Sequence, residues 1–111
     1  MAEGEGESRK GRGVRLSPEE VAAIKAAALE AFGDTAIVRL FGSRVDDAER
    51  GGDIDLHVET EPLDDVWRAK GLFESRLFRR VEPQKVDVIV TERGGVPRGF
   101  ERIAYRDGIV L

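Results

Sequence analysis

Two aspartates lie two positions apart in the segment DIDLHVE, and their type and spacing are suited to chemistry. In an extended strand Asp53 and Asp55 point to the same face, with Cα atoms about 6.7 Å apart, two residues of strand rise. At a separation of about 4 Å the carboxylates would repel by about 4 kcal/mol at an effective dielectric of 20. Solvent, a shared proton, an arginine or a divalent cation must offset this repulsion. Oxygen donors without histidine or cysteine favour Mg²⁺ or Mn²⁺, but aspartates are also common at the solvated start of a strand.

Gly42 and Ser43 form a second feature, directly after the β-rich segment of residues 35–41. Glycine allows a phosphate to approach the backbone, and serine supplies a hydroxyl group. The free N–H groups of a helix that starts here would complement negative charge. Arg44 follows and either adds a phosphate contact or pairs with a neighbouring aspartate. The sequence therefore predicts a phosphate-binding turn.

Asp87 is the third feature, because it interrupts the otherwise apolar segment VDVIV. A carboxylate in a buried strand is costly unless it is paired or bound to a metal. If the strand of residues 85–90 lies beside the strand of residues 53–60, Asp87 joins Asp53 and Asp55 in one carboxylate cluster.

These three features together resemble the nucleotidyltransferase superfamily with the DNA polymerase β-like fold. The matching segments are Phe41–Arg44 (FGSR), Asp53–Leu56 (DIDL) and Lys85–Val90 (KVDVIV), and the likeness extends over about residues 17–111. The short chain is similar to the minimal nucleotidyltransferases that act as antitoxins beside HEPN-domain toxins.

The resemblance implies a Mg²⁺-dependent reaction, with two ions and with Mn²⁺ as an alternative metal. AMP would pass from ATP to a hydroxyl group, for which we expect a tyrosine of a partner HEPN toxin, and pyrophosphate would be released. The resemblance implies the following site residues: Asp53, Asp55 and Asp87 as catalytic and metal-binding residues, and Gly42, Ser43 and Arg44 as nucleotide-binding residues.

Two other functions stay open. The protein could be a non-catalytic antitoxin that neutralises its partner by contact, with a vestigial metal site. It could also transfer a nucleotide to a small molecule, as antibiotic-modifying relatives do, although those usually carry an extra substrate domain. The sequence also leaves open a homo-oligomer.

Composition limits the remaining possibilities. The 111 residues include no cysteine and one histidine, which excludes disulfides, thiolate nucleophiles and sites built from several histidines. There is no apolar run of the roughly 20 residues that a membrane span needs, and no apolar signal-peptide core, so we expect a cytoplasmic protein. The net charge of −4 argues against strong, nonspecific nucleic-acid binding.

The elements that must position these residues follow from local patterns. Residues 1–15 are rich in glycine and charge, and we expect a disordered tail. The resemblance implies that residues 16–111 form a nucleotidyltransferase domain, and we expect an α/β fold with a small mixed β-sheet flanked by helices. Ser17, Pro18 and Glu20 predict a capped helix start, and Gly33 its end. The expected strands are residues 35–41, 53–60 and 85–90, with a short apolar end at 109–111. The expected later helices are residues 64–81 and 97–106, and residues 44–50 are a short helix or turn.

For several other residues the structural interpretation competes with a functional one. We expect His57 to be a partly exposed sheet residue, Phe73 to belong to the core and Tyr105 to pack near the C-terminus. Trp67 is either a core residue or a partner contact. Arg98, Arg102 and Arg106 recur every four residues, which predicts one basic stripe on the last helix.

Overall fold

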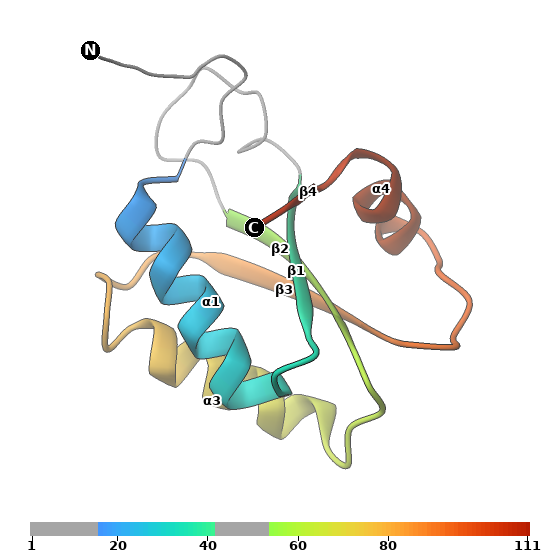
Figure 1. The fold of residues 1–111 in the computed structure, drawn as a ribbon, viewed down its shortest axis with the longest axis horizontal. Helices are drawn as coiled ribbons and strands as arrows, with labels where there is room; N and C mark the ends of the chain where they lie inside the picture. The colour runs from blue at the N-terminus through green and yellow to red at the C-terminus, as the bar shows by residue number, and fades with distance from the viewer. Residues whose placement is uncertain (1–15, 42–53) are drawn as a thin grey trace.

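The computed structural model describes residues 16–41 and 54–111, which form three helices and four strands (Figure 1). The tail of residues 1–15, the short helix or turn of residues 44–50 and the expected phosphate turn lie outside the described residues. The elements in chain order are α1 (Pro18–Phe32), β1 (Ile37–Phe41), β2 (Ile54–Thr60), α3 (Val66–Leu77), β3 (Val86–Glu92), α4 (Phe100–Asp107) and β4 (Ile109–Val110).

The described strands form one mixed sheet in the order β3-β2-β1-β4. β1 is antiparallel to both β2 and β4, whereas β2 and β3 are parallel. Parallel neighbours need a crossover connection, and α3 provides it. The expectation of a small mixed α/β sheet with helices is confirmed, and so is the placement of β3 beside β2.

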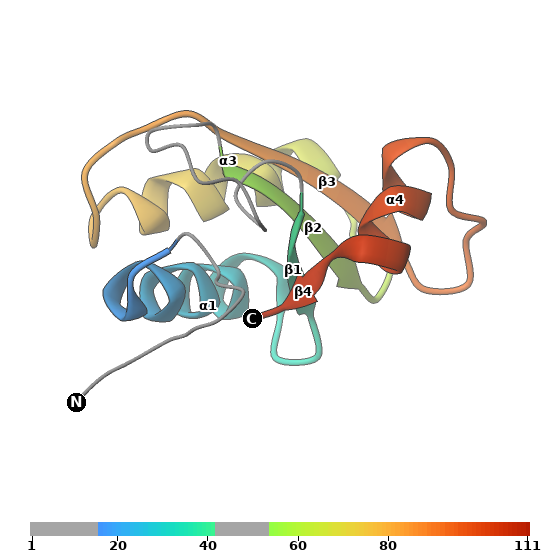
Figure 2. The same ribbon diagram turned by 90° about the horizontal axis from the view of Figure 1, so that it is seen from above.

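Helices cover both faces of this sheet (Figures 1 and 2). α1 and α3 pack against one face and against each other, whereas the short helix α4 lies over the opposite face near β1 and β3. The core lies under α1 and α3. It is filled by alternate apolar side chains of the strands and by the inner faces of both helices, among them Ile24, Phe32, Leu40, Leu56, Val58, Phe73 and Leu77.

The start and end of α1 agree with the sequence prediction. The Oγ atom of Ser17 accepts a hydrogen bond from the backbone N–H of Glu20 at 3.0 Å, and the Glu20 carboxylate accepts one from the Ser17 N–H at 2.9 Å. Pro18 occupies the first turn, where its missing N–H costs nothing. Gly33 ends the helix with a φ of 103°, a conformation that disfavours residues with a Cβ atom.

The later helices are shorter than predicted. α3 begins only at Val66 because Asp65 caps it, accepting a hydrogen bond from the Arg68 N–H at 3.0 Å. It ends at Leu77, so the predicted bounds of residues 64–81 were too wide. α4 begins at Phe100 after Gly99, whose φ is 47°. No helix within the described ranges is long and apolar enough to cross a membrane.

The start of α4 corrects one surface prediction. Arg98 precedes the helix, so the expected stripe of three arginines on one helix face is wrong. Arg102 and Arg106 remain on α4, and the Arg106 guanidinium is paired with Asp107 at 3.0 Å.

Candidate functional site

Two of the three predicted carboxylates lie side by side in the sheet. Asp55 of β2 and Asp87 of β3 are direct register partners on parallel strands, which are about 4.8 Å apart in a sheet. The buried neighbours Leu56 and Val88 point into the core, so the alternation of side chains directs both aspartates to the opposite face. Asp55 is half-buried and Asp87 is exposed. The condition for the predicted carboxylate cluster, that the Asp87 strand lies beside the Asp55 strand, is therefore met.

Both aspartates open into a pocket of about 490 Å³. Its other walls are apolar, and they come from the end of β1, the middle of β3 and the first turn of α4. The lining residues are Phe41, Asp55, Asp87, Ile89, Phe100 and Ile103. The pocket therefore has an acidic part on the sheet and an apolar part between the sheet and α4.

The donor set of this pocket fits a hard divalent cation. Two carboxylates on adjacent strands offer several oxygen atoms from one side of the pocket, and Mg²⁺ commonly uses one or two carboxylates together with substrate phosphates and water. No group of three or more potential metal ligands gathers within residues 16–41 and 54–111. Asp53, which would be the third carboxylate, lies outside these ranges.

The remaining predicted site residues also lie outside the described part of the chain. They are Gly42, Ser43 and Arg44, which follow the end of β1 at Phe41. Phe41 itself pairs in register with Asp55, so the last described residue of β1 lies beside the Asp55 strand. The phosphate-binding turn stays a prediction.

His57 does not behave as the sequence analysis expected. It is fully buried, because α4 packs over this part of the sheet and places the Tyr105 ring 4.7 Å from the imidazole. The His57 Nε2 and the Thr91 Oγ1 share a hydrogen bond of 2.9 Å, while Nδ1 has no partner within the described residues. Burial, and then the positive charge of Arg39, lower the pKa of His57. The expectation of a partly exposed histidine was wrong.

A charged network next to His57 was missed by the sequence analysis. The Glu59 carboxylate accepts hydrogen bonds from Arg39 at 3.0 Å and from Arg93 at 3.1 Å, which connects β1, β2 and the segment after β3. The Arg39 guanidinium carbon lies 4.6 Å from the centre of the Tyr105 ring. Burial raises the pKa of Glu59, but the two arginine hydrogen bonds outweigh it and the pKa lies below its usual value. The alternation in β2, which puts Glu59 on the face of His57, was the available signal.

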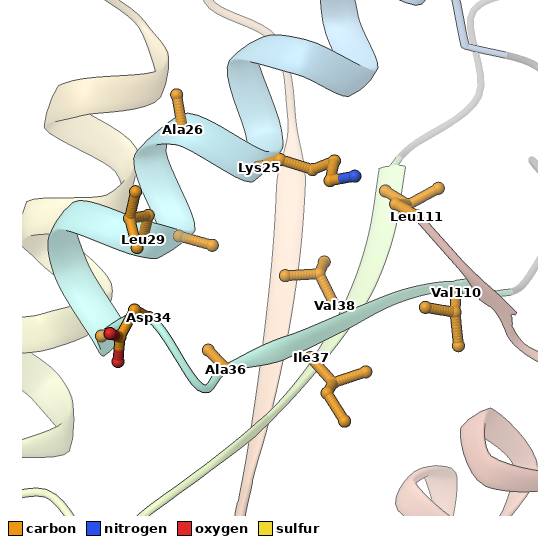
Figure 3. Close-up of a pocket in the computed structure, with 11 residues that line it drawn as sticks. Lys25, Ala26, Leu29, Asp34, Ala36, Ile37, Val38, Val110 and Leu111 are labelled. Carbon is orange, nitrogen blue, oxygen red and sulfur yellow. The ribbon is translucent and has the colours of Figure 1, made fainter.

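A second pocket lies between α1, β1 and the C-terminal residues of the chain (Figure 3). Its volume is about 510 Å³, and most of its lining is aliphatic, including Leu29, Ile37 and Val110. Among the described residues, its charged lining residues are Lys25 and Asp34. Of the predicted site residues that the structure describes, Asp55 and Asp87, neither lines this second pocket.

Two aromatic residues of α3 have different roles. Phe73 is fully buried, with its ring 5.7 Å from that of Phe32, which confirms the core prediction. Trp67 is 79% exposed, and Lys70 lies over its ring at 4.9 Å. Of the two interpretations of Trp67, the core role is therefore wrong.

Comparison with known protein families gives no match, and comparison with curated proteins also gives none. The function is therefore inferred from the residues of the site.

Proposed function

We propose that the protein is a Mg²⁺-dependent nucleotidyltransferase that transfers AMP from ATP to a hydroxyl group. The observation that carries this proposal is the register pairing of Asp55 with Asp87 at the wall of an open pocket. The spacing of Asp53, Gly42 and Ser43 in the sequence adds to it. A pair of adjacent carboxylates in a pocket otherwise lined by apolar side chains suits a site for a cation and a phosphorylated ligand.

In this mechanism each residue has a defined task. Asp53, Asp55 and Asp87 hold the metal, and the turn at Gly42 and Ser43 holds the triphosphate. Bound Mg²⁺ supplies the positive charge that neutralises the phosphate oxygens. The acceptor oxygen bonds to the α-phosphorus while the bond to the β-phosphate oxygen breaks. Pyrophosphate leaves, and the Asp87 carboxylate receives the proton of the acceptor hydroxyl group.

The proposed acceptor is a hydroxyl group of a partner protein, a tyrosine of a HEPN-domain toxin in the cytoplasm. The support for this partner is the resemblance of the short chain to minimal nucleotidyltransferases. A partner that docks beside the pocket would bring its own hydroxyl group to the nucleotide. The exposed Trp67 is a candidate contact for such a partner, because aromatic side chains are enriched at protein interfaces.

The test uses the full chain, co-expressed with the protein encoded beside it, together with Mg²⁺ and ATP labelled in either the α- or the γ-phosphate. The proposal predicts label on the partner from α-labelled ATP only, with one pyrophosphate released per label. Transfer of the γ-label would indicate a kinase instead. A partner that is neutralised without any label would identify a non-catalytic antitoxin, and a labelled small molecule would identify the third function.

A further inference from the structure

We infer that the apolar part of the carboxylate pocket binds the nucleobase of the substrate, with Phe100 as its stacking surface. This inference rests on the proposed function and names the part of the nucleotide that the pocket selects. The roles proposed for the aspartates do not require a base-binding surface, because the aspartates concern only the metal and the phosphates.

The pocket combines acidic side chains on the sheet with apolar side chains of the sheet and of α4. Asp55 and Asp87 provide negative charge on the sheet, and Ile89 follows Asp87 by two positions on the same face of β3. Two residues of strand correspond to about 6.7 Å, the scale of a single nucleotide unit. A nucleotide combines matching groups, with a metal-bound phosphate at one end and a flat ring of low charge at the other.

The apolar part has two walls. On the sheet, Ile89 lies two residues along β3 from Asp87 and Phe41 lies beside Asp55 in register, while Phe100 and Ile103 belong to α4. Phe41 is buried, so the sheet wall is fixed in the structure. Ala104 of the same helix is fully buried, and Tyr105 packs on His57, so α4 is held against the sheet by residues other than Phe100.

Phe100 lies outside the hydrophobic core that the described residues form. Its side chain is 67% exposed although it lines the pocket. Placing a phenyl ring there brings little stability to the free protein. A base that lies on the ring would cover apolar surface on both sides. Every base has a flat π-face, so an aromatic ring at this position can stack on the base of a bound nucleotide.

The test measures the binding of two probes to the full chain by calorimetry, Mg²⁺–ATP and the base-free Mg²⁺–tripolyphosphate. Phe100→Ala should raise the Kd for Mg²⁺–ATP by roughly tenfold, the effect of losing one stacking contact. It should leave the Kd for Mg²⁺–tripolyphosphate unchanged, and Phe100→Tyr, which keeps the ring, should restore ATP binding. Val96→Ala is the matched control, because Val96 is 80% exposed but does not line the pocket.

The two probes separate failure of the inference from failure of the proposed function. If the wild-type chain binds neither probe, both the proposed function and the inference are wrong. If it binds both and Phe100→Ala changes neither Kd, the nucleobase assignment is wrong while the function stands. The assignment is also overturned if Phe100→Ala leaves ATP binding intact but raises the KM for the acceptor, because the wall then serves the acceptor.

Discussion

Asp55 and Asp87 are register partners on the parallel strands β2 and β3, with both carboxylates on the face that α1 and α3 leave uncovered. The sheet thus fixes two like charges next to each other at the wall of a pocket. Like-charge pairs cost free energy in the folded state, and functional sites are where proteins tolerate such costs.

Replacing one of these carboxylates tests whether the pair is strained. Asp87→Asn should keep the free energy of unfolding unchanged or raise it by up to about 1 kcal/mol, because it removes one like charge from a solvent-accessible pair. Urea unfolding of the full chain at neutral pH measures this. A loss of stability well beyond that range would show that Asp87 serves the fold and not a site.

Glu59 should be important for stability, because it joins Arg39 and Arg93. Glu59→Gln should lower the free energy of unfolding by about 1–3 kcal/mol, since charge-assisted hydrogen bonds to partly buried groups are weakened. Glu61→Gln is the matched control. Glu61 pairs with the same Arg93 at 2.8 Å but is 62% exposed, so its loss should cost about 0.5 kcal/mol. Equal effects of the two substitutions would contradict the proposed role of the network.

His57 should make stability depend on pH. Burial and then Arg39 lower its pKa, while Glu101 of α4 and Glu59 of β2 act in the opposite direction. In the window below the ordinary value of 6.5, the unfolded chain binds a proton that the folded chain does not. The stabilisation that the neutral His57 provides is therefore complete above a pH of 6.5, and it is lost as the pH falls through the folded pKa of His57.

Urea unfolding from about pH 7.5 to about pH 5 measures this dependence. His57→Gln cannot titrate but can still reach Thr91 with its amide, so its unfolding free energy should vary less over this interval. The same slope in both proteins would assign the pH dependence to other groups.

Substitution of alanine for two glycines should change the free energy of unfolding in opposite directions. A Cβ atom at Gly108 would clash with the backbone carbonyl oxygen of Ala104 and would lie 3.1 Å from the Cβ of Arg39. Gly108→Ala should therefore cost about 1–3 kcal/mol and loosen the junction of α4 and β4. Gly71 lies within α3, with open space around its position, so Gly71→Ala should add up to about 1 kcal/mol. Thermal unfolding of both variants measures the difference, and a stabilised Gly108→Ala protein would contradict the close packing.

The sequence was most informative where local patterns decide the structure. The capping residues Ser17 and Glu20 located the start of α1, and the alternation in β2 assigned Leu56 to the core and Asp55 to the other face. The predicted starts of α3 and α4 were too early, because capping by Asp65 and the turn at Gly99 compete with helical periodicity.

The candidate site was predictable only in part. Strand order depends on contacts between distant segments, so the pairing of Asp55 with Asp87 could only be stated as a condition. The burial of His57 depends on how α4 packs, which no pattern within β2 reveals. The site roles of four further residues stay predictions from the sequence alone: Gly42, Ser43, Arg44 and Asp53.

The most direct test of the proposed function is calorimetric titration of Mg²⁺–ATP into the wild-type chain and into Asp55→Asn and Asp87→Asn, with Glu61→Gln as an exposed carboxylate control. Binding to the wild type should require Mg²⁺. Both aspartate variants should bind at least roughly tenfold more weakly, because even groups that only support a metal ligand contribute that much. Glu61→Gln should bind as the wild type does. Binding that is indifferent to Mg²⁺, or unchanged in both aspartate variants, would contradict the nucleotidyltransferase proposal.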